Sequence, residues 1–193
     1  HGLDNVSEAI RDSCNVFFYT VGNRLAQKKT GTYSDANGIS LIQKYAHIYG
    51  LDEKTGLEIV ENQSKIATEF PVMAAIGQSD NNITTVALSR YVTAVANRGT
   101  VYSLSLIDKT TDSNGKLIKD YTPEVVNQMD EISSSTWDLV HNGMESMVKS
   151  SSTFAGMDIS MGGKTGTAQY SKIHADNAVS YTHLRAHETG RNL

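Results

Sequence analysis

Sequence patterning changes along this chain from helical to strand-like, and that order limits its fold more than any single motif does. Apolar residues recur at helical spacing in residues 7–25, 39–49 and 84–98. Residues 100–121 then alternate and are rich in strand-favouring residues, before a helical stripe returns at residues 133–148. Mainly helical segments followed by strand-containing ones predict an α+β fold with an antiparallel sheet, in preference to a doubly wound parallel fold.

The helical segments have recognisable ends. Ser13-Cys14-Asn15 interrupts the first segment, which predicts a helix, a tight break and a second helix. Gly50 is expected to end the next helix as a C-cap, and Thr84 or Thr85 to begin the third as an N-cap. Asp52–Ser64 is polar and has no period, so we expect an irregular segment there.

Strands are expected in two places. Thr100–Lys109 and Lys116–Tyr121 read as the arms of a hairpin, because Ser113-Asn114-Gly115 between them is typical of a tight turn. A further strand is predicted over Lys164–Tyr170, directly after the pair Gly162-Gly163.

Composition excludes several classes of protein. With 193 residues, 39% of them hydrophobic, the chain fits a globular unit of about one domain. A formal charge of -4 gives no basic surface for nucleic acid, which we therefore do not expect as a partner. Cys14 is the single cysteine, so no intramolecular disulfide is possible and a small buried filler is its expected role.

Neither a cofactor nor a metal ion is expected. His183 and His187 stand four apart, as two helical ligands would, but no third ligand accompanies them. His47 and His141 lie in helical segments without a carboxylate or cysteine partner in the pattern, which favours packing or surface roles. The longest apolar stretch, Phe70–Ile76, falls short of the roughly 18 residues that a membrane helix requires.

The segment Gly162-Gly163-Lys164-Thr165-Gly166-Thr167-Ala168 brings a cation and two hydroxyls together where glycine lets another backbone approach. Such a strand suits a peptide that ends in a carboxylate, which would add to the sheet edge and meet Lys164 by charge-assisted bonds. The plain alternative is a surface turn with a solvated lysine. A phosphate-binding P-loop is excluded by spacing, because Asp158 stands where its first glycine is needed.

A second Lys-Thr-Gly occurs at Lys54-Thr55-Gly56, so the tripeptide alone is weak. It stands between acidic residues in a polar segment, whereas the Lys164 copy follows a glycine pair and leads into Thr167-Ala168. We expect the Lys164 copy to be the functional one.

Ser13-Cys14-Asn15 gains meaning beside this strand, because serine acyltransferases of the β-lactamase and penicillin-binding group combine Ser-x-x-Lys, Ser-x-Asn and Lys-Thr-Gly. On these motifs the chain resembles the transpeptidase domain of a class B, monofunctional penicillin-binding protein. The other segments that carry the resemblance are His1-Gly2, Ala9-Ile10, Phe17-Phe18-Tyr19, Ile76-Gly77-Gln78, Ala96-Asn97-Arg98-Gly99, Trp137 and Gly143-Met144.

The resemblance implies a penicillin-binding/β-lactamase-like transpeptidase fold, with an antiparallel sheet packed with helices and a mainly helical subdomain. It also implies peptidoglycan D,D-transpeptidase activity. A serine attacks the D-Ala-D-Ala carbonyl of a stem peptide and forms an acyl-enzyme, and a neighbouring stem's amine then takes the acyl group. By motif, Ser13 would relay protons, Asn15 would hold the substrate amide and Lys164 would supply positive potential.

For substrate binding, the resemblance implies that Thr165 and Thr167 contact the substrate carboxylate, with Gly166 between them, and that the Thr167 N–H contributes to an oxyanion hole. β-Lactams would acylate the same serine. The family implies an extracytoplasmic site on the bacterial cytoplasmic membrane and cell-wall synthesis membrane proteins as partners. The alternatives are a β-lactamase or D,D-carboxypeptidase, which would use water as acceptor, and a non-catalytic penicillin sensor.

The chain departs from the family pattern in three ways. No Ser-x-x-Lys stands before Ser13, and Ser146-Met147-Val148-Lys149 follows it, in the wrong order. We therefore expect residues 1–179 to be a partial transpeptidase domain, cut from a larger protein and inactive alone. Ser79 replaces the glycine that usually follows Ile-Gly-Gln. Residues 180–193 do not read as the expected buried strand, and we expect a non-native tail there.

Overall fold

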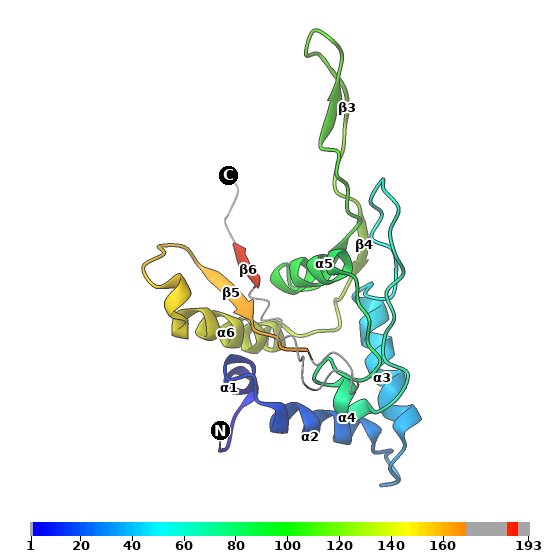
Figure 1. Ribbon diagram of the computed structural model, residues 1–193, viewed down its shortest axis with the longest axis vertical. Helices are drawn as coiled ribbons and strands as arrows, with labels where there is room; N and C mark the ends of the chain where they lie inside the picture. Colours follow the sequence, from blue (N-terminus) through cyan, green and yellow to red (C-terminus); the bar gives the residue numbers. More distant parts are fainter. Residues whose placement is uncertain (1, 169–184, 189–193) are drawn as a thin grey trace, which may run out of the picture. The chain divides into compact units, whose positions relative to one another are not determined.

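The computed structural model describes residues 2–168 and 185–188, which pack as two units (Figure 1). The first unit comprises His1–Gln43, Ala67–Asn81 and Ile132–Leu193, and the second comprises Lys44–Ile66 and Asn82–Glu131. None of the helices within the described residues is both long and apolar enough to cross a membrane.

Helices make up most of the first unit, and their ends follow ordinary capping chemistry. Asn5 Oδ1 accepts the Glu8 N–H (3.0 Å), while the Glu8 carboxylate accepts the Asn5 N–H (2.9 Å), a reciprocal capping box. Ser133 Oγ accepts the Thr136 N–H (3.2 Å) in the same way. The helices are α1 (Val6–Arg11), α2 (Asn15–Ala26), α3 (Asp35–Ile48, its last turn in the second unit), α4 (Pro71–Ala74), α6 (Ser134–Ser150) and the 3-10 turn η1 (Ser152–Phe154).

The helix, break and helix predicted around Ser13 are confirmed, as are the helices at residues 39–49 and 133–148. The sequence did not predict α4. This short helix begins where Phe70 takes a left-handed backbone conformation (φ 52°) and Pro71 fixes the first turn, so its start depends on backbone geometry rather than on apolar spacing.

Two strands complete the first unit. β5 (Met161–Lys164) pairs antiparallel with β6 (Arg185–Glu188), with Lys164 opposite Arg185. The strand predicted over Lys164–Tyr170 therefore lies too late. Strand pairing runs from Met161 to Lys164, with Met161 and Gly163 buried, while Gln169 and Tyr170 lie outside the described residues.

Residues 180–193 do not read as a buried strand, yet Arg185–Glu188 form strand β6. The edge of β5 supplies the backbone partners for β6, and side-chain patterning carries no information about them. The proposed division of the chain at residue 179 stays a prediction.

Helix α6 lies between α1 and β5 (Figure 1) and packs closely against both. On one side, a Cβ at Gly143 would lie 2.8 Å from Ile10 Cβ and from the Ser7 carbonyl oxygen. Ser7 Oγ also donates to the Leu139 carbonyl (2.7 Å). On the other side, Met147 and Val148 form a buried cluster with Met161 of β5. This layering holds the end of α1 and the end of β5 against one helix.

We predict that Gly143→Ala lowers the free energy of unfolding by about 1 to 3 kcal/mol, because the added methyl overpacks the α1–α6 contact. Chemical denaturation of the variant and of Asn142→Ala, a change at the exposed neighbouring position, measures the effect. Equal stability of the two variants would contradict a close α1–α6 contact.

The second unit contains α5 (Thr85–Ala96) and four short strands, β1 (Thr100–Tyr102), β2 (Lys109–Thr111), β3 (Leu117–Asp120) and β4 (Val125–Gln128). Thr84 is the N-cap of α5, as predicted, and its Oγ1 accepts the Ala87 N–H (3.2 Å). β1 pairs with β4, and β2 pairs with β3, both antiparallel. The α+β prediction with antiparallel strands is therefore confirmed, although the sheets are two-stranded.

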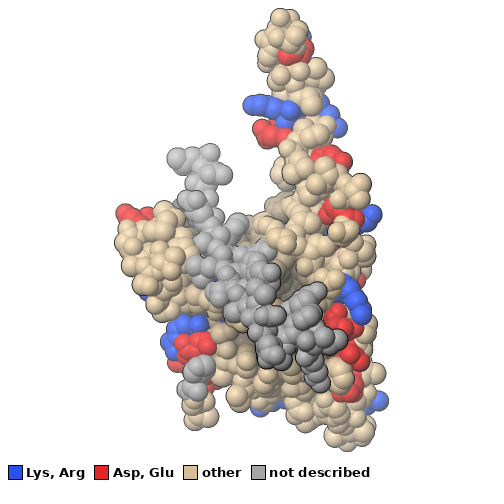
Figure 2. Space-filling model, viewed as in Figure 1, with Lys and Arg blue, Asp and Glu red and all other residues tan. Residues whose placement is uncertain are grey.

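The predicted hairpin needs one correction. β2 and β3 form it around Ser113-Asn114-Gly115, but Thr100–Lys109 is not one continuous strand. The Ser103 N–H still donates to the Glu124 carbonyl beside β4 (2.8 Å), but the chain then bonds elsewhere. The Leu104 N–H donates to the Thr55 carbonyl (2.8 Å) and the Leu106 N–H to Glu58 (2.9 Å), so the pairing with β4 does not continue. Side chains of both charge signs lie along the β2–β3 hairpin (Figure 2).

Candidate active site

Ser13 lies in the break between α1 and α2, where the backbone exposes it. α1 ends at Arg11, and Ser13 adopts a left-handed conformation (φ 52°) that turns the chain sharply before α2 begins at Asn15. The Cys14 N–H donates to the Ala9 carbonyl (3.0 Å), and the Cys14 side chain is buried, as predicted. Cys14 therefore anchors the turn, and Ser13 stays exposed.

Lys164 is the last residue of β5, and glycine allows this strand to lie close to α6. A Cβ at Gly162 would approach Met144 Cβ to 3.3 Å, which is tighter than ordinary contact. Gly163 is buried, as is Met161 two residues earlier. The sequence predicted a close contact at Gly162-Gly163, but it did not indicate that the neighbouring side chain is Met144.

The two motifs meet at a single hydrogen bond. Lys164 Nζ donates to Ser13 Oγ at 2.7 Å, across 151 positions of the chain, and also to the Thr165 carbonyl at 2.9 Å. Partial burial lowers the pKa of the Lys164 ammonium, because desolvation disfavours the charged form. An ammonium can only donate, so Ser13 Oγ is the acceptor and its own proton is available to another acceptor.

The structure brings only part of the predicted site together. Thr165 contributes its carbonyl to the Lys164 ammonium, whereas Gly166 and Thr167 follow β5 and are exposed. Asn15 is the exposed first residue of α2. Within the described residues, we find no hydrogen bond from the side chains of Asn15 or Thr167. Their contacts with substrate therefore stay predictions.

The second Lys-Thr-Gly has a structural explanation, in the second unit. The Glu61 carboxylate accepts hydrogen bonds from the Thr55 hydroxyl (2.6 Å) and from the N–H groups of Thr55 (3.0 Å), Gly56 (3.0 Å) and Leu57 (3.2 Å). The segment thus wraps around a carboxylate of its own chain, and Thr55 is only 1% exposed. This copy holds a loop in place.

Glu61 makes the stability of this loop depend on pH. Desolvation acts to raise the pKa of Glu61, but the hydrogen bonds from Thr55, Gly56 and Leu57 outweigh it and lower the pKa. A carboxyl with a lowered folded pKa stabilises the fold fully above its unfolded pKa, about 4.3, and loses that effect as the pH falls through the folded value.

We predict that the free energy of unfolding falls as the pH drops below about 4, and that Glu61→Gln shows a smaller fall. At pH 7 the same variant should lose about 1 to 2 kcal/mol, since an amide oxygen accepts these bonds less well. Denaturant titrations at pH 7 and pH 3.5 test this, with the exposed Glu124→Gln as control. The same pH dependence in Glu61→Gln and Glu124→Gln would contradict it.

The misplaced Ser146-x-x-Lys149 also has a structural role. It lies on α6, where Met147 and Val148 are buried and Lys149 Nζ pairs with Glu145 at 2.8 Å, four residues earlier. Nothing in this arrangement brings the lysine onto Ser146.

Histidines and acidic residues form no metal cluster of three or more in the described part of the chain. His183 lies outside the described residues, and only the backbone of His187 is described, in β6. His47 is exposed, in agreement with the expected surface role, and its Nδ1 lies 3.2 Å from the Asp52 carboxylate, a partner that the sequence pattern did not indicate. Asp52 follows the end of α3 at Ile48, and the turn through Gly50 brings it back toward His47.

Comparison of the sequence with family models identifies the family of this chain. The family model for the penicillin binding protein transpeptidase domain matches residues 1–186. The chain therefore belongs to the penicillin-binding protein transpeptidase family, and the resemblance inferred from its motifs is confirmed.

Curated relatives agree with this assignment. Penicillin-binding protein H of Bacillus subtilis (strain 168) is 26% identical over 183 residues, which cover 87% of this chain and 26% of that protein. The chain spans about a quarter of the length of the curated relatives it matches.

Among solved structures, penicillin-binding protein 2B of Streptococcus pneumoniae (strain R6) superimposes with a TM-score of 0.72 and 22% identity, covering 93% of this chain and 32% of that one. Penicillin-binding protein A of M. tuberculosis, solved as a penicillin G acyl-enzyme complex, gives a TM-score of 0.66 and 21% identity, covering 86% and 35%. At these identities the structures show a shared fold, which confirms the predicted fold class.

Proposed function

We propose that this chain forms part of a peptidoglycan D,D-transpeptidase, a serine acyltransferase that cross-links stem peptides through an acyl-enzyme. The observation that carries the proposal is the 2.7 Å hydrogen bond from Lys164 Nζ to Ser13 Oγ. It joins the two motifs that serine acyltransferases of this group use together. Membership of the penicillin-binding transpeptidase family supports the reaction class.

The nucleophile is the serine of a Ser-x-x-Lys segment that precedes Ser13 in the parent protein. Its hydroxyl attacks the carbonyl of the D-Ala-D-Ala peptide bond, the bond to the terminal D-Ala breaks, and an ester to the serine forms. The amine of a neighbouring stem then attacks the ester, makes the cross-link and frees the serine. This chain alone lacks the nucleophile and is inactive.

Ser13 and Lys164 move and stabilise charge in this reaction. Ser13 Oγ has a second lone pair, so it can take a proton on one side while it donates its own to the leaving amine on the other. The Lys164 ammonium holds Ser13 in this orientation and stabilises the developing negative charge. Its lowered pKa favours proton exchange with the hydroxyl.

The segment after β5 binds the substrate. The hydroxyls of Thr165 and Thr167 donate hydrogen bonds to the substrate carboxylate, and Gly166 between them lets the peptide lie against the backbone. The Thr167 N–H forms part of the oxyanion hole, and the side-chain amide of Asn15 donates a hydrogen bond to the stem peptide. β-Lactams acylate the same serine as mimics of D-Ala-D-Ala. By family, the parent protein acts at the extracytoplasmic face of the bacterial membrane, with cell-wall synthesis membrane proteins as partners.

A peptide assay of the parent protein, including its Ser-x-x-Lys segment, tests the proposal. A synthetic stem peptide ending in D-Ala-D-Ala is incubated with an amine acceptor, and the products are identified by mass spectrometry. We expect free D-Ala and a product in which acceptor and donor are joined. If the only product were the stem peptide released by hydrolysis, the protein would be a carboxypeptidase. Rapid hydrolysis of penicillin would indicate a β-lactamase. Stable acylation by penicillin without any peptide turnover would indicate a sensor.

A further inference from the structure

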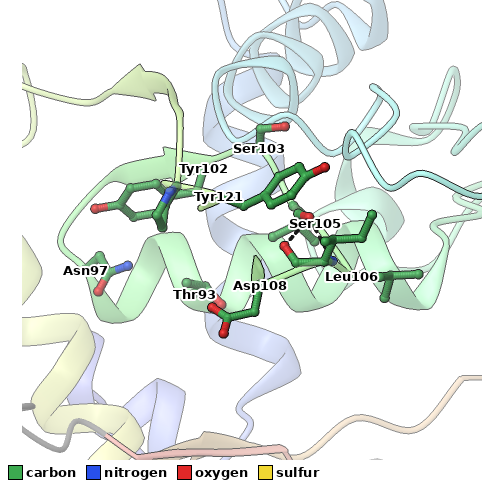
Figure 3. Close-up of a pocket in the computed structure, with 11 residues that line it drawn as sticks. Thr93, Asn97, Tyr102, Ser103, Ser105, Leu106, Asp108 and Tyr121 are labelled. Carbon is green, nitrogen blue, oxygen red and sulfur yellow. Dashed lines mark hydrogen bonds between the residues drawn. The ribbon is translucent and has the colours of Figure 1, made fainter. Parts of the chain in front are cut away.

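A pocket of about 480 Å³ lies within the second unit, on the side of α5 where the chain leaves β1 (Figure 3). Thr93 and Asn97 of α5 line one side of it. Tyr102 at the end of β1 and Tyr121 after β3 line another, and the segment from Ser103 to Asp108 lines the rest. None of these residues belongs to the acyl-transfer motifs, so this pocket is separate from the candidate active site in sequence and in unit.

The part of the wall between Ser103 and Asp108 has no regular secondary structure, but hydrogen bonds hold it in place. Glu58 accepts from the Ser105 hydroxyl (2.6 Å) and the Leu106 N–H (2.9 Å). Ser105 Oγ in turn accepts the Ile107 N–H (2.9 Å), and the Asp108 carbonyl accepts the Tyr121 N–H (3.0 Å). Bonding to Ser105 and Leu106 also lowers the pKa of Glu58. The pocket is therefore preformed, which reduces the entropic cost of binding.

The lining favours a cation with an apolar stem. Asp108 is the one charged residue among the lining residues, and within the described chain its carboxylate has no hydrogen bond or ion pair. Two tyrosine rings offer faces that attract cations. Lys119, which does not line the pocket, already places its Nζ 4.3 Å from the centre of the Tyr121 ring. Leucine, isoleucine and proline side chains supply the apolar part of the wall.

We propose that this pocket binds a lysine or arginine side chain presented by a peptide. The cationic group pairs with the Asp108 carboxylate, and the methylene stem lies against Tyr102 and Tyr121. Asn97 and Thr93 add polar contacts on the α5 side. Charge complementarity and aromatic faces select such a side chain over a neutral one of the same shape.

Titration of the chain with two matched probes tests this proposal. Nα-acetyl-arginine N-methylamide carries the cation, and its citrulline analogue has the same shape without the charge. We expect amide chemical-shift changes at the pocket residues and an affinity about tenfold higher for the arginine probe. Asp108→Asn should remove this preference, while Asp120→Asn, an exposed aspartate of β3 outside the pocket, should keep it.

Variants at Tyr121 keep the test decisive if Asp108→Asn does not fold. Tyr121→Leu should weaken binding of both probes several-fold, and Tyr121→Phe should restore it, because the ring rather than the hydroxyl makes the contact. Equal affinity for arginine and citrulline probes, or an unchanged preference in a folded Asp108→Asn variant, would overturn the proposal. Shift changes confined to residues outside the pocket would overturn it as well.

Discussion

Replacing Lys164 with alanine in the parent protein should lower the rate of acylation by penicillin about 10²- to 10³-fold. The change removes the ammonium that holds Ser13 Oγ at 2.7 Å and that stabilises developing negative charge, and loss of one such donor typically has an effect of this size. Stopped-flow measurement with a fluorescent penicillin gives the rate. The fold should survive, because Lys164 ends β5 and is only partly buried.

Two other lysines are matched controls for this prediction. Lys54 belongs to the second Lys-Thr-Gly, and Lys149 to the misplaced Ser-x-x-Lys. Both are exposed, so Lys54→Ala and Lys149→Ala should leave the acylation rate within about twofold of the wild type. If Lys164→Ala were acylated as fast as these controls, Lys164 would have no part in the reaction.

Ser13→Gly should lower the acylation rate about 10²-fold without a matching loss of stability. The substitution deletes the hydroxyl that accepts from Lys164 and relays the proton. Glycine adopts the left-handed conformation at φ 52° more readily than serine, so the turn between α1 and α2 is preserved. Acylation kinetics and thermal denaturation of the same preparation separate the two effects.

Ser79→Gly is the matched control, because Ser79 also has a positive φ (72°). Its hydroxyl donates an ordinary hydrogen bond to the Glu69 carbonyl (2.7 Å). It should change the acylation rate little. A similar loss of rate in both variants would mean that the hydroxyl of Ser13 has no special role and that the effect is structural.

The sequence predicted the elements that depend on apolar spacing and caps. The break at Ser13, the cap at Thr84 and the helix around Trp137 came from such local signals, and the structure has all three. Ser79 has a positive φ, a conformation that glycine adopts readily, which fits the glycine that the family pattern predicts at that position.

Features that depend on partners distant in sequence could not be predicted in this way. The end of β1 at Tyr102 is fixed by bonds from Leu104 and Leu106 to Thr55 and Glu58, and β6 forms because β5 offers its edge. For the site, motif order predicted that Ser13 and Lys164 belong together. Their direct hydrogen bond, and the layering of α1, α6 and β5 that allows it, appear only in three dimensions.

Mass spectrometry can identify the residue that penicillin acylates, both in the parent protein and in this chain. We predict one penicilloyl group on the serine of the Ser-x-x-Lys segment before Ser13, and no label on this chain alone at the same concentration. Label on any serine within this chain, or none on the folded parent protein, would contradict it.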